Sequence, residues 1–296
     1  MEDISQSFLS SAETDSFREI AAHSGLDPSF SKSNYPLLFP VFCCLSAEAA
    51  SFFSCNLSLE MAKRNKRVLV VDFCLERPNV RYLMGNLLDL QNDFPVKNTC
   101  HLDFKIENIK LFGFSKITIV SLALSGEHIY SKQIIKRIFA DQSIDESDII
   151  LINSPNGPDD LPAQEPFTYF QKALFLMDSR MNSLLKTYSW IKKFFPACQQ
   201  YCAGVVFQSD EDAGLPQQNA AKLEKVISKY LSISPIVNPT VNSAFNPAIR
   251  NLVTVVPMDQ EAISSIRIRK PLVLMESLSA SSQAISNLCE SLLSSE

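Results

Sequence analysis

The chain has 296 residues, of which 46% are hydrophobic and 20% charged, and its formal net charge is −5 at pH 7. This length and composition are typical of a globular protein with a sizeable core. The acidic balance argues against a dominant nucleic-acid-binding surface, which needs clustered Lys and Arg. Because no apolar run reaches the roughly 20 residues that span a bilayer, we expect a cytoplasmic protein without direct membrane insertion.

The first 35 residues are rich in serine, and only residues 15–22, DSFREIAA, have amphipathic helical spacing. This composition predicts a flexible N-terminal tail over residues 1–35, which could serve as a docking peptide. We expect residues 36–296 to form a single α/β domain.

From residue 37 onward, short apolar runs rich in β-branched residues alternate with segments of helical spacing. The expected strands lie at 37–44, 67–73, 116–122, 148–153, 173–177, 202–207 and 252–256. The expected helices lie at 49–65, 131–142, 183–195, 219–231 and 260–268. This alternation predicts a mostly parallel twisted sheet with helices on both faces, because parallel strands need crossover connections. Ligands of such sheets bind beyond the carboxyl ends of the strands.

Cysteine usage predicts neither a zinc finger nor a disulfide framework. Cys198 and Cys202 could share a helix face, but the three histidines of the chain are scattered, so buried thiols are the simpler interpretation. The neighbours Cys43 and Cys44 leave a redox-responsive switch open, although adjacent cysteines form a strained disulfide at best.

Several blocks, in the same order, resemble the MinD/ParA group of deviant-Walker P-loop ATPases. They are residues 55–85, residues 148–160 (DIILINSPNGPDD), residues 173–195 and residues 252–288. The resemblance extends over residues 37–293 and implies a P-loop fold. The segments SLALSGE (121–127) and LEKVISKYLSI (223–233) favour the branch that contains the flagellar-number regulator FlhG.

The resemblance also locates the expected nucleotide site. It aligns the family's phosphate loop, GKGGVGKT, with Cys44, Leu45, Ser46, Ala47, Glu48, Ala49, Ala50 and Ser51. A P-loop needs glycines so that backbone N–H groups approach the phosphates, a Lys on the β and γ phosphates, and a hydroxyl on Mg²⁺. Only Ser51, at the hydroxyl position, matches. Leu45 and Ala50 stand at the two lysines, and Glu48 adds a carboxylate, so the electrostatics oppose a polyphosphate.

The remaining motif positions depart in the same way. Asp72 matches the first Asp of the family's Asp-x-Asp, but Cys74 replaces the second. Asn153 stands at the Walker B Asp and supplies no carboxylate. Phe207 and Gln208 stand at the adenine-contacting Asn-Arg pair. An alternative for Asp72 is a strand-end residue that caps a loop, and for Ser51 an ordinary helix residue.

The sequence therefore predicts a catalytically inactive pseudo-ATPase that binds no cofactor and acts as a protein-interaction or positioning regulator. Flagellar, pilus or other polar assembly is the process that the resemblance suggests. The expected partners are proteins, including an active MinD/ParA-type paralogue, and not nucleic acid; a homodimer is also compatible with the sequence. The alternative is a residual or noncanonical ATPase that works in a heterodimer with an active paralogue, which donates the missing cation.

Two further expectations concern the ends of the domain. If Ser46 is a helix N-cap, Glu48 lies in the first helical turn, where it could substitute electrostatically for the absent phosphate. The C-terminal segment 279–296 contains no Lys or Arg. We therefore expect Ala284, Ile285, Leu288 and Leu292 to pack on the domain rather than on an anionic lipid surface.

Overall fold

The computed structural model describes most of the chain between Pro36 and Ser294. The described residues are 36–74, 79–84, 103–109, 117–123, 147–160, 172–194, 202–209, 214–230 and 254–294. The predicted tail and the helix predicted at 131–142 lie outside these residues.

The described strands form one sheet. They are β1 (Leu37–Cys43), β2 (Val68–Asp72), β3 (Asp103–Ile109), β4 (Ile117–Ala123), β5 (Ile149–Ser154), β6 (Lys172–Met177), β7 (Cys202–Ser209) and β8 (Thr254–Pro257). The strand order is β3-β4-β2-β5-β1-β6-β7-β8, and every neighbouring pair is parallel except β3 and β4, which are antiparallel. The predicted mostly parallel sheet is confirmed.

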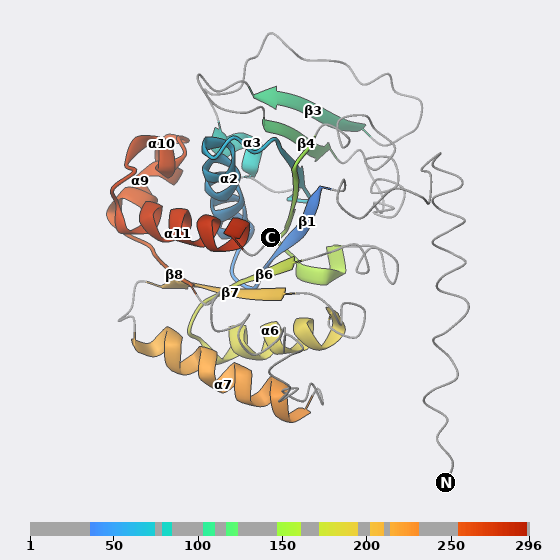
Figure 1. Ribbon diagram of the computed structural model, residues 1–296, viewed down its shortest axis with the longest axis vertical. Coiled ribbons are helices and arrows are strands. Elements are labelled where there is room, and N and C mark those ends of the chain that lie inside the picture. The colour runs from blue at the N-terminus through green and yellow to red at the C-terminus, as the bar shows by residue number, and fades with distance from the viewer. Residues whose placement is uncertain are drawn as a thin grey trace, which may run out of the picture.

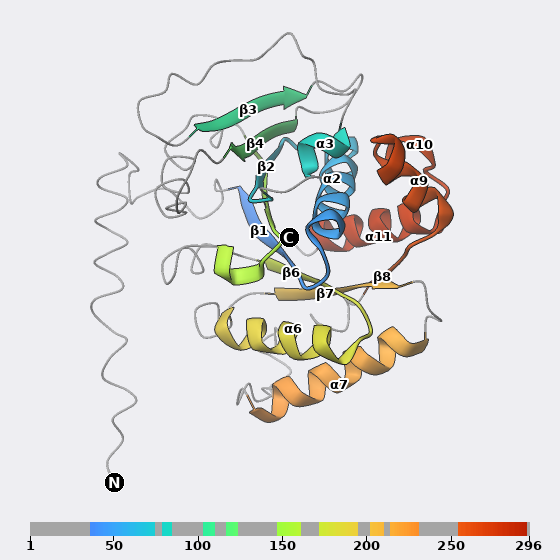
Figure 2. The same ribbon diagram turned by 180° about the vertical axis from the view of Figure 1, so that it is seen from behind.

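Helices cover both faces of this sheet, as predicted (Figure 1). The described helices are α2 (Ala47–Lys63), α3 (Val80–Met84), α6 (Met181–Phe194), α7 (Gly214–Tyr230), α9 (Gln260–Ile268), α10 (Leu272–Met275) and α11 (Ala280–Ser294), with a 3-10 helix η4 at Gly157–Asp160. The helices α2, α3 and α9 to α11 lie on one side, and α6 and α7 on the other (Figures 1 and 2). None of the described helices combines the length and the apolar composition that a membrane span requires.

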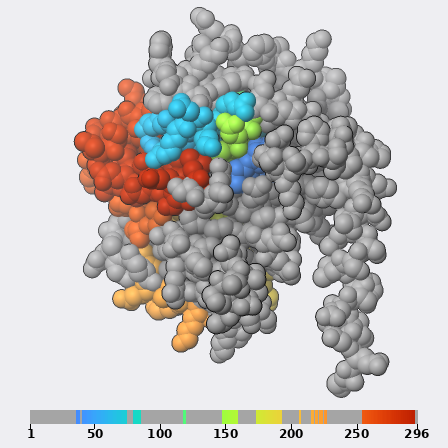
Figure 3. Space-filling view, viewed as in Figure 1, coloured from blue at the N-terminus to red at the C-terminus, as the bar shows by residue number. Residues whose placement is uncertain are grey.

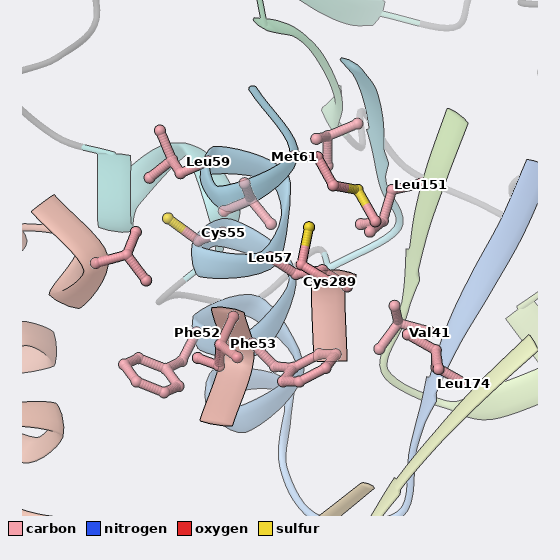
Figure 4. Packing of buried hydrophobic residues seen from close by; sticks show 14 of the residues in the cluster. Val41, Phe52, Phe53, Cys55, Leu57, Leu59, Met61, Leu151, Leu174 and Cys289 are labelled. Atoms are coloured by element: carbon pink, nitrogen blue, oxygen red, sulfur yellow. The ribbon is translucent and has the colours of Figure 1, made fainter. Parts of the chain in front are cut away.

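Helix α2 is the centre of the core. Every residue from Ala49 to Ala62 is buried, because the sheet lies on one side of the helix and α3, α10 and α11 on the others. Side chains such as Phe52, Phe53 and Met61 leave the helix in several directions and all meet other apolar groups (Figure 4). A helix that is largely apolar all round is expected to be enclosed in this way.

The C-terminal helices complete this core. Ile285, Leu288 and Leu292 of α11 are fully buried and Ala284 packs against the same cluster, so the predicted packing of this segment is confirmed. Asp259 joins α9 to α11, since its carboxylate accepts hydrogen bonds from the backbone N–H groups of Ala262 (2.8 Å) and Ser281 (3.0 Å).

The C-terminal helices also meet α3 at the surface. The Arg269 guanidinium lies 4.0 Å from the centroid of the Tyr82 ring. In the space-filling view, the red C-terminal residues and the cyan residues around α3 form one continuous surface (Figure 3).

Five described elements have no counterpart among the predicted strands and helices: β3, α3, η4, α10 and α11. The predicted boundaries also shift, most clearly at α7, which begins at Gly214 rather than at residue 219. Helix α2 begins at Ala47, two residues earlier than predicted, and this shift bears on the candidate site.

Candidate functional site

The turn between β1 and α2 is short. Strand β1 ends at Cys43, and only Cys44, Leu45 and Ser46 separate it from the first helical residue, Ala47. Ser46 is the N-cap: its Oγ accepts from Ala49 N at 3.1 Å and its carbonyl from Ala50 N at 3.0 Å. The positions aligned with the end of the phosphate loop, residues 47–51, are therefore helix rather than an open loop.

The first two residues of this turn have backbone N–H groups that are hydrogen-bonded within the chain. Cys44 N donates to Leu176 O at 2.8 Å, and Leu45 N donates to Cys43 Sγ at 3.4 Å. A phosphate cradle needs such N–H groups directed at the ligand. Here the N–H groups of residues 44, 45, 49 and 50 have protein acceptors instead.

Glu48 lies in the first turn of α2, as predicted, and its side chain is exposed. A negative charge at this position is favoured by the helix dipole. Its proposed role as a substitute for phosphate stays a prediction. Ala49, Ala50 and Ser51 are buried, whereas Cys44 and Leu45 are partly exposed.

Beneath this turn, the structure brings together three predicted positions from three elements. Asn153 at the end of β5 donates from Nδ2 to Asp72 Oδ1 at 2.8 Å and to Ser51 Oγ at 3.2 Å. Its Oδ1 accepts from Ser54 Oγ at 3.1 Å. All four residues have no exposed surface. We refer to Ser51, Ser54, Asp72 and Asn153 as the core polar cluster.

Asp72 accepts two backbone hydrogen bonds from described residues that follow β2. Its Oδ1 accepts from Cys74 N at 3.0 Å and its Oδ2 from Val80 N, at the start of α3, at 2.9 Å. Complete burial raises the pKa of Asp72 to about 6, although the hydrogen bonds from Asn153, Cys74 and Val80 lower it. At neutral pH the cluster therefore contains one buried carboxylate, stabilised by three N–H donors.

The cluster does not fit the Mg²⁺ ion that the resemblance implies. Mg²⁺ requires oxygen ligands in octahedral geometry and usually keeps several waters. Here Asn153 stands at the Walker B Asp, and its amide N–H groups point at Ser51 Oγ, the hydroxyl at the Mg²⁺ position, and at Asp72 Oδ1. Both carboxylate oxygens of Asp72 already accept hydrogen bonds, and the cluster is closed to solvent.

The loop after β5 is fixed against α6. Gly157 has φ +77°, and a Cβ atom at this position would lie 2.3 Å from the Trp190 ring, so only glycine fits. Trp190, the single tryptophan of the chain, also packs on Phe42, with 6.4 Å between the ring centroids. Ser154 Oγ donates to Gly157 O at 2.6 Å. Trp190 thus reports on the region where β1 and β5 end.

Cys74, Phe207 and Gln208 are the remaining predicted positions of the site. Cys74 contributes its backbone N–H. Phe207 and Gln208 lie in β7, opposite Val255 and Val256 of β8, and their side chains are outside the described part of the structure. Sequence reasoning missed Ser54, although its spacing of three from Ser51 places both hydroxyls on one face of a helix.

The two adjacent cysteines are free thiols. Burial raises the pKa of Cys43 to about 12 and that of Cys44 to about 11, which disfavours the reactive thiolate. Cys44 Sγ lies 3.0 Å from Thr187 Oγ1, within hydrogen-bonding distance. These observations favour structural thiols over a redox switch. Cys198, of the pair considered for zinc, is outside the described residues.

No protein-family model matches the chain, and no curated protein matches it. Several solved structures do match the chain. The ParA family ATPase from Chlorobium tepidum TLS matches with a TM-score of 0.61 at 14% identity, over 87% of this chain and 98% of that chain. The MinD cell division protein from Aquifex aeolicus matches with a TM-score of 0.56 at 13% identity, over 87% and 96% of the two chains.

Two further matches contain partners. The MinC:MinD complex of Aquifex aeolicus gives a TM-score of 0.54 at 15% identity, over 87% of this chain and 95% of that chain. The pNOB8 ParA bound to nonspecific DNA gives a TM-score of 0.50 at 11% identity, over 88% of this chain and 98% of that chain. At these identities the likeness shows the fold: this chain has the sheet and flanking helices of the MinD/ParA P-loop NTPases, the superfamily that the sequence blocks resemble.

Proposed function

We propose that the protein is a pseudo-ATPase of the MinD/ParA fold, which keeps the architecture of the nucleotide site but uses it without nucleotide. The observation that supports this proposal most directly is the core polar cluster. Ser51 resembles the family's Mg²⁺-binding hydroxyl, and Asn153 stands at the Walker B Asp that supports the ion. The Asn153 amide joins Ser51 to Asp72, and all three residues are closed to solvent. The short β1–α2 turn, without glycine or lysine, supports it independently.

The proposed activity is regulation through a protein partner. The fold is shared with a MinD that is seen with MinC and with a ParA that is seen on DNA. The net charge of −5 favours a protein over nucleic acid for this chain. The FlhG-like segments at 121–127 and 223–233 suggest positioning of a flagellum, pilus or other polar assembly as the process.

The test is a titration of the purified full chain with Mg-ATP, followed by thermal unfolding and by Trp190 fluorescence. A ligand at 100 times its Kd stabilises a protein by about 2.7 kcal/mol. We expect no change in Tm and no change in fluorescence. A clear rise in Tm for the isolated chain overturns the proposal.

A second arm addresses the heterodimer alternative. The chain is mixed with an active MinD/ParA-type ATPase, and phosphate release is compared with that of the active enzyme alone. Turnover that requires Glu48 or Ser51 of this chain in the mixture would favour a noncanonical ATPase over a regulator. Turnover that is unchanged by Glu48→Gln and Ser51→Ala supports a regulatory role.

A further inference from the structure

Asn153 occupies the centre of the core polar cluster and connects three elements. Its Nδ2 atom is 2.8 Å from Asp72 Oδ1 at the end of β2 and 3.2 Å from Ser51 Oγ in α2, while Asn153 itself lies in β5. A group of positive character that joins a carboxylate to a hydroxyl is the arrangement that a divalent cation makes with oxygen ligands. In this chain the group is a polarised amide NH₂.

The orientation of this amide follows from the chemistry of its neighbours. An ionised carboxylate accepts hydrogen bonds and cannot donate them, so Nδ2 must face Asp72. The opposite atom, Oδ1, then meets the Ser54 hydroxyl, which donates to it at 3.1 Å. Reversing the amide would direct Oδ1 at the Asp72 carboxylate and lose these contacts.

We propose that Asn153 is a built-in substitute for a divalent cation, and that this residue makes the site independent of metal. The inference deepens the proposed function and rests on it for the correspondence of Ser51 with the Mg²⁺ hydroxyl and of Asn153 with the Walker B Asp. A cation that entered the cluster would have to displace N–H groups that already satisfy Asp72. The amide also repels a cation, because its hydrogen atoms point at the oxygens that would bind one.

The inference predicts the effect of replacing a single atom. Asn153→Asp exchanges Nδ2 for oxygen with almost no change in shape, so Ser51, Asp72 and residue 153 become an all-oxygen ligand set. Without metal, two carboxylates at hydrogen-bonding distance repel each other and the fold loses stability. With a divalent cation, the same two carboxylates bind it.

The experiment compares the wild-type chain with Asn153→Asp in the absence of nucleotide. Each protein is titrated with MnCl₂ and MgCl₂, with Tm measured by thermal unfolding and bound Mn²⁺ by electron paramagnetic resonance. We expect the wild type to show no metal-dependent change. Asn153→Asp should have a lower Tm without metal, and its Tm should rise by about 5 °C at 100 times the Kd for Mn²⁺.

Asn56 provides a matched control. It is also an asparagine with 1% exposure, and its amide bonds to the backbone of Phe52 and Val273 rather than to an acidic side chain. Asn56→Asp therefore adds the same buried charge without creating a pair of carboxylates. We expect it to lower Tm without rescue by Mn²⁺. Equal rescue of both variants would mean that the metal acts nonspecifically, and would overturn the inference.

Asn153→Ser covers the case in which Asn153→Asp does not fold without metal. It removes the bridging amide, keeps an oxygen and adds no charge, so we expect a smaller Mn²⁺-dependent rise in Tm than for Asn153→Asp. Folding of Asn153→Asp only in the presence of Mn²⁺ supports the inference. Binding of Mn²⁺ to the wild type as tightly as to Asn153→Asp overturns the inference. It is also overturned if both Asn153→Ser and Asn153→Asp fold and neither responds to the metal.

The outcomes are separable from those of the nucleotide titration. Mn²⁺ binding to the wild type overturns the role of Asn153 without restoring ATP binding. A response of the wild type to ATP, with no response to Mn²⁺ alone, overturns the pseudo-ATPase proposal and leaves the role of the Asn153 amide standing.

Discussion

Polar groups are stabilised in different ways at the two ends of helix α2. Toward its N-terminus lies the core polar cluster, which has no exposed surface and a single carboxylate, Asp72. Toward its C-terminus, Glu60 pairs with Lys63 at 2.6 Å and with Arg64 at 2.7 Å, and the side chains of these two cations are 23% and 29% exposed. The first arrangement depends on neutral donors, whereas the second depends on charge pairs beside solvent.

The ion pairs also fasten the C-terminal helices. Lys63 Nζ donates to Val273 O at 2.6 Å, and the Arg64 guanidinium donates to Ser286 O at 3.1 Å. We refer to Glu60, Lys63, Arg64, Val273 and Ser286 as the C-terminal tie. Loss of one member of the C-terminal tie should cost little stability, because the tie lies beside solvent and water can replace the missing hydrogen-bond partner. A closed cluster does not tolerate such a loss, since removal of one partner leaves buried donors and charge without compensation.

The largest effect is expected for Asn153→Leu, which keeps the approximate volume and removes the amide. Asp72 and Ser51 lose a donor and Ser54 loses its acceptor, so the free energy of unfolding should fall by about 4 kcal/mol. Urea unfolding at pH 7 measures this. The loss should be the same at 0.05 and 1 M NaCl, because buried groups are poorly screened. A loss below about 1 kcal/mol would remove the distinction between the two ends of α2.

The pH dependence of stability tests the buried charge itself. The pKa of Asp72 is raised from 3.8 to about 6 in the folded chain, mainly by burial. Its contribution to stability is therefore complete below about pH 4 and is lost as pH rises through about 6. A shift of roughly two pKa units corresponds to about 3 kcal/mol.

Asp72→Asn is the reference for this measurement, because it cannot titrate. The free energy of unfolding of the wild type minus that of Asp72→Asn should decrease by about 2.4 kcal/mol between pH 4 and pH 7. Urea unfolding at four pH values in this range follows the difference. A difference that does not vary with pH would show that Asp72 is not the buried carboxylate that the cluster requires.

Most of the sheet could be predicted because parallel strands are buried on both faces. Every residue of β2 and β5 is buried, so both appear as continuous apolar runs in the sequence. Strand β3, DFKIENI, pairs antiparallel at the edge of the sheet and has no continuous apolar run, so a search for such runs missed it although its polar and apolar residues largely alternate. Helix α10 has four residues, too few to produce a periodic pattern.

The positions of the candidate site were predictable, but its chemistry was not. The resemblance selected Ser51, Asp72 and Asn153, and the structure brings these three together. The Asn153 amide bridges the other two residues. This bridge depends on distances between residues that are far apart in the chain, and no local sequence pattern contains those distances. The start of α2 was predicted late because Ala47 and Glu48 carry no apolar periodicity; the N-cap Ser46 was the correct signal.

Glu60→Gln tests the C-terminal tie. It keeps the shape of the side chain and removes both ion pairs, while Lys63 and Arg64 keep their bonds to Val273 and Ser286. We expect a loss of about 1 kcal/mol at low salt, which decreases at 1 M NaCl. Urea unfolding at both salt concentrations, beside Asn153→Leu, makes the comparison direct. A loss for Glu60→Gln that is insensitive to salt would mean that solvent does not screen the tie.

The smallest expected effect concerns Glu48, the exposed charge at the N-terminal end of α2. Because it lies in the first helical turn, Glu48→Gln should lower the free energy of unfolding by about 0.5 kcal/mol at low salt and by almost nothing at 1 M NaCl. Ser46→Ala is the matched control, since loss of the cap to Ala49 N should cost about 1 kcal/mol at either salt concentration. An unchanged Tm of Glu48→Gln at low salt would contradict the role of this carboxylate as a substitute for phosphate at the N-terminal end of α2.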